Sequence, residues 1–149
     1  MLLNRILLAA VMALLMLGEV SCNTGAPGLK ERVLEYAHNA HDAELAQQYA
    51  TPLMQEAMAK LEGSGVRAAT PGTATGLQGK PAEALARVAA KDIKISSRGK
   101  WAQAAVSVTT EQGVEVVKTV WLKVDGVWYL FSGLSGELSK YGKPPYFVD

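Results

Sequence analysis

The sequence Val-Asp-Gly-Val at positions 124–127 constrains the fold of this chain more than any other local feature. Asp-Gly is a preferred pair at the centre of a two-residue type I′ turn, which joins two antiparallel strands. Residues of high strand propensity flank the turn, from Val114 to Lys123 on one side and from Trp128 to Phe131 on the other. This segment therefore predicts a β-hairpin towards the end of the chain.

The two-residue turn also determines which side chains share a face of the predicted hairpin, because side chains alternate along a strand. Pairing outward from the turn places three pairs on one face: Val124 with Val127, Leu122 with Tyr129, and Val120 with Phe131. The other face carries Trp121 opposite Leu130 and Lys123 opposite Trp128. Since both faces carry aromatic residues, we expect helices to cover one and a tail or a second subunit to cover part of the other.

Upstream of the hairpin, the spacing of apolar residues changes from about 3.6 residues to two at Asp92. Helices are predicted over 29–40, 43–50, 52–63 and 81–90, with Asp42 and the Thr51 hydroxyl as N-caps of the second and third. A glycine-rich crossing loop with a short strand around Val66 to Thr70 precedes the fourth helix, and strands follow Asp92. The pattern predicts an α+β fold in which N-terminal helices pack on a curved antiparallel sheet of about four strands, with an irregular tail from about residue 132.

The first 21 residues are far richer in apolar side chains than the rest of the chain. Sixteen of them are apolar, whereas apolar residues make up about 45% of the remainder, which is ordinary for a globular domain. A charged start, Met1 to Arg5, precedes an unbroken run of 12 apolar residues from Ile6 to Leu17. A bilayer-spanning helix needs about 20 apolar residues, and a secretory signal about 7–15. We therefore predict a signal peptide at 1–21, a lipidated or flexible tether at 22–28, and a single domain at 29–149.

Cys22 is the single cysteine of the chain and directly follows the signal segment. With Ser21 before it and residues 23–28 behind it, it resembles the lipidation site of bacterial lipoproteins, although Glu19 stands where that pattern has Leu or another aliphatic residue. The resemblance implies acylation of the Cys22 thiol and of the new amino terminus, and several acyl chains together make anchoring stable. The alternative is ordinary cleavage after Cys22, which would yield a freely secreted protein.

Two segments of the predicted domain resemble a known superfamily. Residues Ala40 to Pro52 are similar to the bend between the first helices of the nuclear transport factor two-like (cystatin-like cone) superfamily, and Trp121 to Leu130 is similar to its closing hairpin. The resemblance spans about Leu29 to Phe131 and is greatest to bacterial envelope lipoproteins of unknown function. It implies a sheet curled around the helices into a cone, which holds an enzyme pocket in some members and a ligand or protein site in others.

Four aromatic residues are candidates for a ligand or partner surface. Trp121 and Trp128 share one face of the predicted hairpin. If that face points away from the helices, the two side chains would join an interaction patch or a homodimer surface with Trp101 and Tyr129. Core packing beneath the tail is the alternative for the tryptophans.

Candidates for catalysis and metal binding have simpler structural explanations. Asp92, Tyr36, Tyr49 and Tyr129 would have to point into a cone to act as catalysts, and tyrosines at such positions are more often amphipathic core residues. The motif that contains Glu35, His38, His41 and Asp42 lacks the second copy that a helical di-metal site needs. We therefore assign no catalytic residue, no metal ligand and no cofactor.

The charge balance of 15 Lys+Arg against 14 Asp+Glu argues against a nucleic-acid partner. The densest basic segment contains Lys91, Lys94, Arg98 and Lys100 and ends at Trp101. Contact with anionic lipid headgroups is one interpretation of this segment, and the solvated polar face of an edge strand is the other, which we favour here.

These expectations predict a non-catalytic domain in the bacterial cell envelope, anchored to a membrane and facing the periplasm or the exterior, or else secreted. It would bind a protein partner or a small apolar ligand. The competing hypothesis is a small pocket enzyme of the same fold, of isomerase, dehydratase or hydrolase type. A filled apolar interior would favour the binding protein, whereas titratable groups that converge in a sealed cavity would favour the enzyme.

Overall fold

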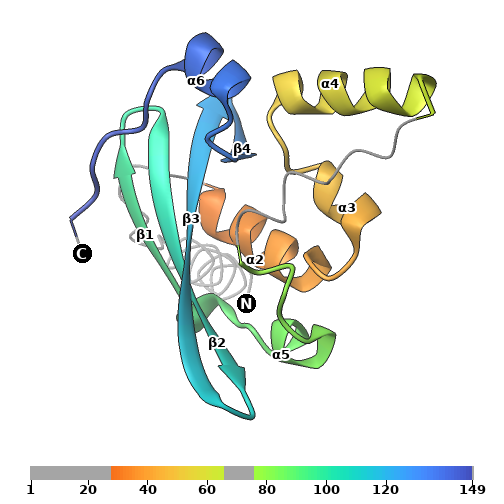
Figure 1. Cartoon of the computed structure of the whole chain (residues 1–149). Helices are drawn as coiled ribbons and strands as arrows, with labels where there is room; N and C mark the ends of the chain where they lie inside the picture. The colour runs from red at the N-terminus through yellow and green to blue at the C-terminus, as the bar shows by residue number, and fades with distance from the viewer. Residues whose placement is uncertain (1–27, 66–75, 149) are drawn as a thin grey trace, which may run out of the picture.

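The computed structural model describes residues 28–65 and 76–148, in which a layer of helices packs on one antiparallel sheet (Figure 1). Helices and a 3₁₀ turn precede the strands: α2 (Leu29–Asn39), α3 (Ala43–Gln47), α4 (Pro52–Gly63), α5 (Ala82–Ala86) and the turn Ala90–Asp92. Four strands and a last helix follow: β1 (Ile93–Arg98), β2 (Trp101–Thr110), β3 (Gly113–Val124), β4 (Val127–Phe131) and α6 (Ser135–Tyr141). The predicted α+β class is confirmed. The predicted signal peptide, Cys22 and the strand at Val66 to Thr70 lie outside the described residues.

The strands form a meander in the order β1-β2-β3-β4, each antiparallel to the next. The turn between β3 and β4 has the positive φ values of a type I′ hairpin, 49° at Asp125 and 82° at Gly126. The register is the predicted one, from Val124 opposite Val127 to Val120 opposite Phe131. Local turn chemistry therefore sets the alignment of the whole hairpin.

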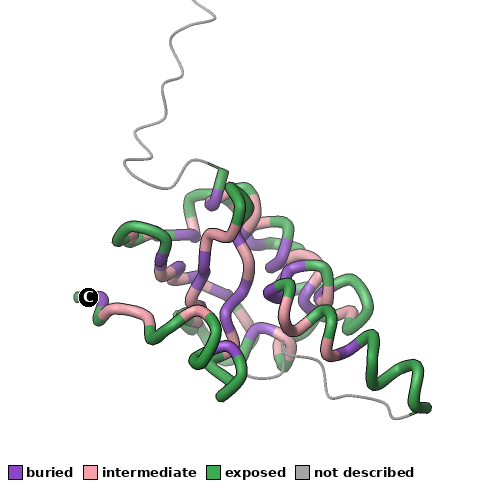
Figure 2. Tube along the Cα trace, turned by 90° about the horizontal axis from the view of Figure 1, so that it is seen from above, coloured by how far each residue is buried: buried purple, intermediate pink, exposed green. Residues whose placement is uncertain are grey.

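Helix α2 packs its apolar stripe on the inner face of the sheet. The stripe predicted from its spacing is buried, and the same core cluster includes strand residues such as Val106 and Trp121. Figure 2 shows the buried residues gathered in the middle of the molecule. Burial of apolar area at about 25 cal/mol per Å² makes this contact the main source of stability.

Helix α3 is shorter than predicted because the chain leaves it to join the sheet. Asp42 caps the helix as expected, since its carboxylate accepts hydrogen bonds from the amides of Glu44 and Leu45. The helix ends at Gln47, three residues before the predicted end. The carbonyl oxygen of Tyr49 then accepts a hydrogen bond from the Leu130 amide at 2.6 Å. This bond to the edge strand β4 replaces the last helical turn.

Thr51 does not cap α4 with its hydroxyl, which corrects the prediction. The hydroxyl instead donates a hydrogen bond to the buried carboxylate of Glu137, at 2.6 Å. The Leu53 amide in the first turn of α4 bonds to the Tyr141 hydroxyl at 3.3 Å. Glu137 and Tyr141 belong to α6, so the segment predicted to be an irregular tail contains a helix that binds the start of α4.

The predicted helix over 81–90 is divided into the five-residue α5 and the 3₁₀ turn. Two hydrogen bonds hold the chain between them out of a helical conformation. The His38 Nε2 lies 2.7 Å from the Val88 carbonyl oxygen, and the Asp92 carboxylate accepts the Ala89 amide at 2.9 Å. Both partners, His38 and Asp92, lie outside the predicted helix, which explains why periodicity alone overestimates its length.

Candidate functional site

The tryptophans proposed as a binding surface are buried in the structure. Trp121 is 0% exposed and Trp128 4%, and both belong to the core between the sheet and α2. Trp101 is 7% exposed and packs on the opposite face with Leu122, Phe131 and Phe147. Of the four candidates, Tyr129 alone is half-buried. The face that carries Trp121 and Trp128 therefore points towards the helices, and the tryptophans offer no open patch.

Aromatic side chains fill the inner side of the sheet, where the cone of the resembled superfamily would have its pocket. Tyr36 packs edge-on against Tyr49, with ring centroids 5.3 Å apart, and against Trp121 at 5.7 Å. All three side chains are at most 1% exposed. Edge-to-face contacts of this kind add to the stability of a core.

Polar side chains of α2 near these rings form hydrogen bonds to other segments of the domain. Arg32 stacks over the Tyr49 ring at 4.5 Å and donates hydrogen bonds to the carbonyl oxygens of Trp128 and Gln48. The Asn39 side-chain amide bonds to the Tyr49 hydroxyl at 3.1 Å. His38 donates from Nε2 to the Val88 carbonyl, because a carbonyl oxygen can only accept. These contacts account for Tyr49 and His38 as structural residues.

The other catalytic and metal-binding candidates are also accounted for. Asp92 caps the Ala89 amide, and Asp42 caps α3. Within residues 28–65 and 76–148, no three potential ligands among His, Cys, Asp and Glu come together as a metal site would require. Glu35 is exposed, so it does not complete a set of metal ligands with His38.

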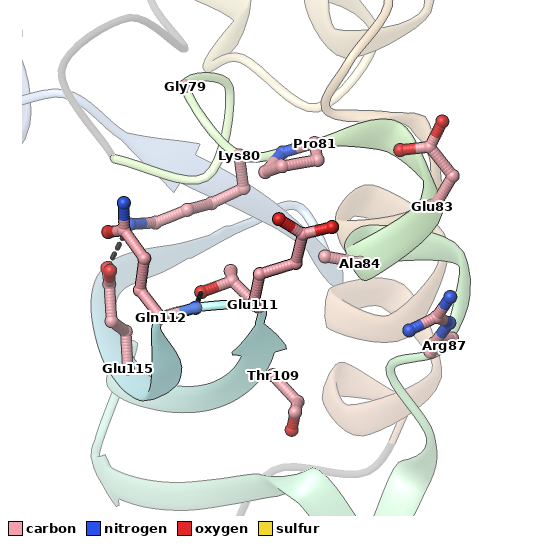
Figure 3. A pocket seen from close by; sticks show the side chains of 11 residues that line it. Gly79, Lys80, Pro81, Glu83, Ala84, Arg87, Thr109, Glu111, Gln112 and Glu115 are labelled. Carbon is pink, nitrogen blue, oxygen red and sulfur yellow. Dashed lines mark hydrogen bonds and ion pairs between the residues drawn. The ribbon is translucent and has the colours of Figure 1, made fainter.

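A cavity of about 450 Å³ opens outside this core, between α5 and the hairpin that joins β2 to β3 (Figure 3). An ion pair between Lys80 and Glu115 lies on one side of it, and Glu83 and Arg87 of α5 lie on the other. Its lining includes no histidine, cysteine or tyrosine. The carboxylates of Glu83, Glu111 and Glu115 belong to exposed residues. They lack the burial that tunes a catalytic carboxylate.

The outer face of the sheet is divided into a covered and an open half. The C-terminal segment covers one half, where Phe147 packs on Trp101. In the open half Val114 and Val116 of β3 are 66% and 58% exposed. Their cross-strand neighbours on β2 are the small polar residues Thr109 and Ser107. Sequence reasoning missed this patch, although the alternation of valines at 114 and 116 placed both on the face of Leu122.

Comparisons with known proteins identify no relative of this chain. Searches find no matching family model, no matching curated protein and no matching solved structure. None of the helices in the described ranges has the length and apolar character needed to cross a bilayer. A proposal for the function therefore depends on the sequence and on the geometry of the domain.

Proposed function

We propose that this chain is an exported, lipid-anchored domain of the bacterial cell envelope that binds a protein partner and catalyses no reaction. The signal-like segment and Cys22 support export and anchoring. We also propose membership of the nuclear transport factor two-like superfamily, supported by the order of elements: helices first, then an antiparallel meander that ends in a tight hairpin.

The filled interior is the observation that carries the binding function. Tyr36, Tyr49 and Trp121 occupy the inner face of the sheet in direct ring contact, which leaves a substrate no room among them. Catalysis by acid or base requires titratable side chains that converge on bound substrate. A filled apolar interior instead suits a rigid platform whose outer surface does the binding.

A protein partner fits the open half of the outer sheet face better than a small apolar ligand does. The two exposed valines lie on an open strand surface, which suits contact with another protein surface. A small apolar ligand needs an enclosed apolar pocket. The cavity at α5 is open and most of its lining side chains are charged or polar.

Site-specific photo-crosslinking in the native envelope tests the partner surface. A photoreactive amino acid at Val116 should yield a discrete crosslinked protein, and the same amino acid at Lys60 on α4 should not. Both side chains are exposed, so the pair is matched for access. A product of twice the chain mass would identify the partner as a second copy. Equal crosslinking at both positions, or at neither, would contradict the proposed surface.

The intact mass of the mature protein extracted in detergent tests the anchor separately. Acylation should add the mass of the acyl chains to a protein that begins at Cys22. An unmodified amino terminus at Asn23 would contradict anchoring and leave a secreted protein.

A further inference from the structure

The basic residues that lie close together in sequence at 91–100 are separated in the structure. Strand β1 runs from Ile93 to Arg98, so Lys91 precedes one end of the strand and Lys100 follows the other. Six residues at about 3.3 Å each place these ends about 20 Å apart. The sequence cluster is therefore two pairs of cations, Lys91 with Lys94 and Arg98 with Lys100.

Arg98 and Lys100 meet further cations at the end of the sheet where β1 turns into β2. The backbone amide of Lys123 donates to the Lys100 carbonyl at 2.8 Å, and the Lys100 ammonium donates to the Tyr141 carbonyl at 3.1 Å. Lys140 is the neighbour of Tyr141 in α6. We call these four residues, Arg98, Lys100, Lys123 and Lys140, the basic end. Figure 1 shows the turn after β1, the tip of β3 and α6 at the same, upper end of the molecule.

Aromatic rings, not carboxylates, lie beside three of these cations. The ammonium groups of Lys100, Lys123 and Lys140 lie 5.7, 5.6 and 5.4 Å from the ring centroids of Trp101, Trp128 and Tyr141. Ring faces attract a cation without cancelling its charge. The salt bridges of Lys60 with Glu56 and of Lys80 with Glu115 include no residue of the basic end.

Acidic groups near the basic end leave it with a positive charge. Asp125 is exposed in the turn after β3, whereas Glu137 of α6 is buried and hydrogen-bonded to Thr51 and Ser132. Glu56 of α4 also faces this region. Its pKa is lowered mainly by a hydrogen bond from Lys60 and in small part by Lys140. Four cations therefore face three carboxylates: Asp125 in the turn, the buried Glu137, and Glu56, which is already paired with Lys60.

The predicted tether joins the domain at the start of α2, which reaches the basic end through one side chain. Arg32, in the first turn of α2, donates a hydrogen bond from Nε to the Trp128 carbonyl, and Trp128 pairs with Lys123. Residues 23–28 separate Cys22 from the start of α2 at Leu29. Seven residue steps span at most about 25 Å. An acyl anchor on Cys22 would therefore keep the domain, and with it the basic end, within reach of the lipid surface.

Exposed apolar side chains lie at the turn of the hairpin and along the C-terminal segment. Phe147 packs in the cluster of Trp101, and its neighbours Tyr146 and Val148 are 81% and 69% exposed beside it. Val127 is exposed at the turn between β3 and β4. Tyrosine is enriched where headgroups meet water, and basic residues near a membrane surface attract anionic lipid.

We infer that the domain rests on anionic phospholipid headgroups through its basic end. This inference rests on the proposed anchor, which supplies the short tether. It leaves the open half of the outer face, with Val114 and Val116 at the other end of β3, directed away from the membrane and accessible to a partner.

Vesicle cosedimentation of the mature chain, residues 22–149 with Cys22→Ser, tests the inference without any acyl chain. Every described element and both core clusters lie within these residues. Binding to vesicles that contain phosphatidylglycerol should exceed binding to pure phosphatidylcholine by about tenfold or more, and high salt should abolish the difference. Equal binding to both kinds of vesicle would overturn the inference.

A matched pair of double variants locates the contact on β1. Arg98→Gln with Lys100→Gln should weaken binding to anionic vesicles by about tenfold or more, because each basic residue near the surface contributes about 1 kcal/mol. Lys91→Gln with Lys94→Gln removes the same charge from the other end of the strand and should change binding by less than about threefold. Equal losses from both pairs would mean that only net charge matters, which would overturn the inference.

The Lys100 substitution also removes the bond to Tyr141, so Arg98→Gln alone provides a second variant. Its side chain is exposed, and about a threefold or greater loss of binding is expected with an unchanged melting temperature. No loss in this variant would contradict the proposed orientation. Because the chain used here carries no lipid, these results are independent of the mass measurement that tests the anchor.

Discussion

The two faces of the four-stranded sheet have different roles, although they are made by alternate residues of the same strands. On the inner face, Ala102, Trp121 and Leu130 lie side by side across three strands and belong to one core with α2. On the outer face, Trp101, Leu122 and Phe131 form a smaller cluster that is covered only by the C-terminal segment. Beyond that cluster the outer face is open at Val114 and Val116.

Under the proposed function, this difference separates the residues that stabilise the domain from those that bind a partner. Helices cover the inner face and aromatic side chains fill its core, so its residues should dominate the free energy of unfolding. The outer face depends on a short segment held by a few contacts, and half of it remains available for binding. Substitutions on the two faces should therefore affect different measurements.

Trp121→Ala tests the inner face and should have the largest effect. Removal of a fully buried tryptophan leaves a cavity and should lower the free energy of unfolding by about 3–5 kcal/mol. Urea unfolding followed by circular dichroism measures this change. Val114→Ala on the open face is the control and should change stability by less than about 0.5 kcal/mol. A loss of less than about 1 kcal/mol for Trp121→Ala would mean that the inner core is not continuous.

Glu137→Ala tests how α6 and the C-terminal segment are attached. Glu137 accepts the Thr51 hydroxyl at 2.6 Å and the Ser132 amide at 3.0 Å, and both donors would lose their partner. Stability should fall by about 2–3 kcal/mol. Glu137→Gln keeps a carbonyl acceptor at the same position and should cost less. If Gln proved as damaging as Ala, the charge of Glu137 and not its hydrogen bonds would be responsible.

Phe147→Ala tests the cover of the outer face and should cost about 1–2 kcal/mol. This is less than for a core phenylalanine, because Phe147 is buried against one side only, in the four-residue outer cluster. Thermal unfolding and proteolysis of the C-terminal segment measure the change. The exposed neighbour Tyr146 provides the control, since Tyr146→Ala should leave both measurements unchanged.

Val116→Ser should have the smallest effect on stability and a large effect on binding. The side chain is already 58% exposed, so the free energy of unfolding should change by less than about 0.5 kcal/mol. Crosslinking from a photoreactive amino acid at Val114 should be lost in this variant. Retention of the crosslink would show that the exposed valines do not form the partner contact.

Local sequence patterns predicted the parts of the fold that depend on neighbouring residues. The turn at Asp125 and Gly126, the strand register that follows from it, the stripe of α2 and the cap at Asp42 are all as expected. Each rests on the backbone preference of one or two residues or on a repeat of apolar side chains. The export signal and the lipid on Cys22 remain predictions of the same kind.

Contacts between distant segments account for what local patterns missed. Helix α3 ends early because Tyr49 bonds to β4, and Thr51 turns its hydroxyl to Glu137, which lies 86 positions further along the chain. Helix α6 has only seven residues, too few to be stable alone, and it is held by Glu137 and by Tyr141 against α4. The sequence around one partner of such a bond contains no signal that identifies the other partner.

The sequence by itself determined the α+β class, the hairpin register and which residues share each face of the sheet, because alternation and turn geometry are local properties. It did not determine which face meets the helices. Trp121 and Trp128 could have formed an outer patch or a core, and both faces carry aromatic residues. The tertiary structure decided the matter by packing α2 on one face and Phe147 on half of the other. That choice depends on the total apolar area buried by all elements together, which no single segment specifies.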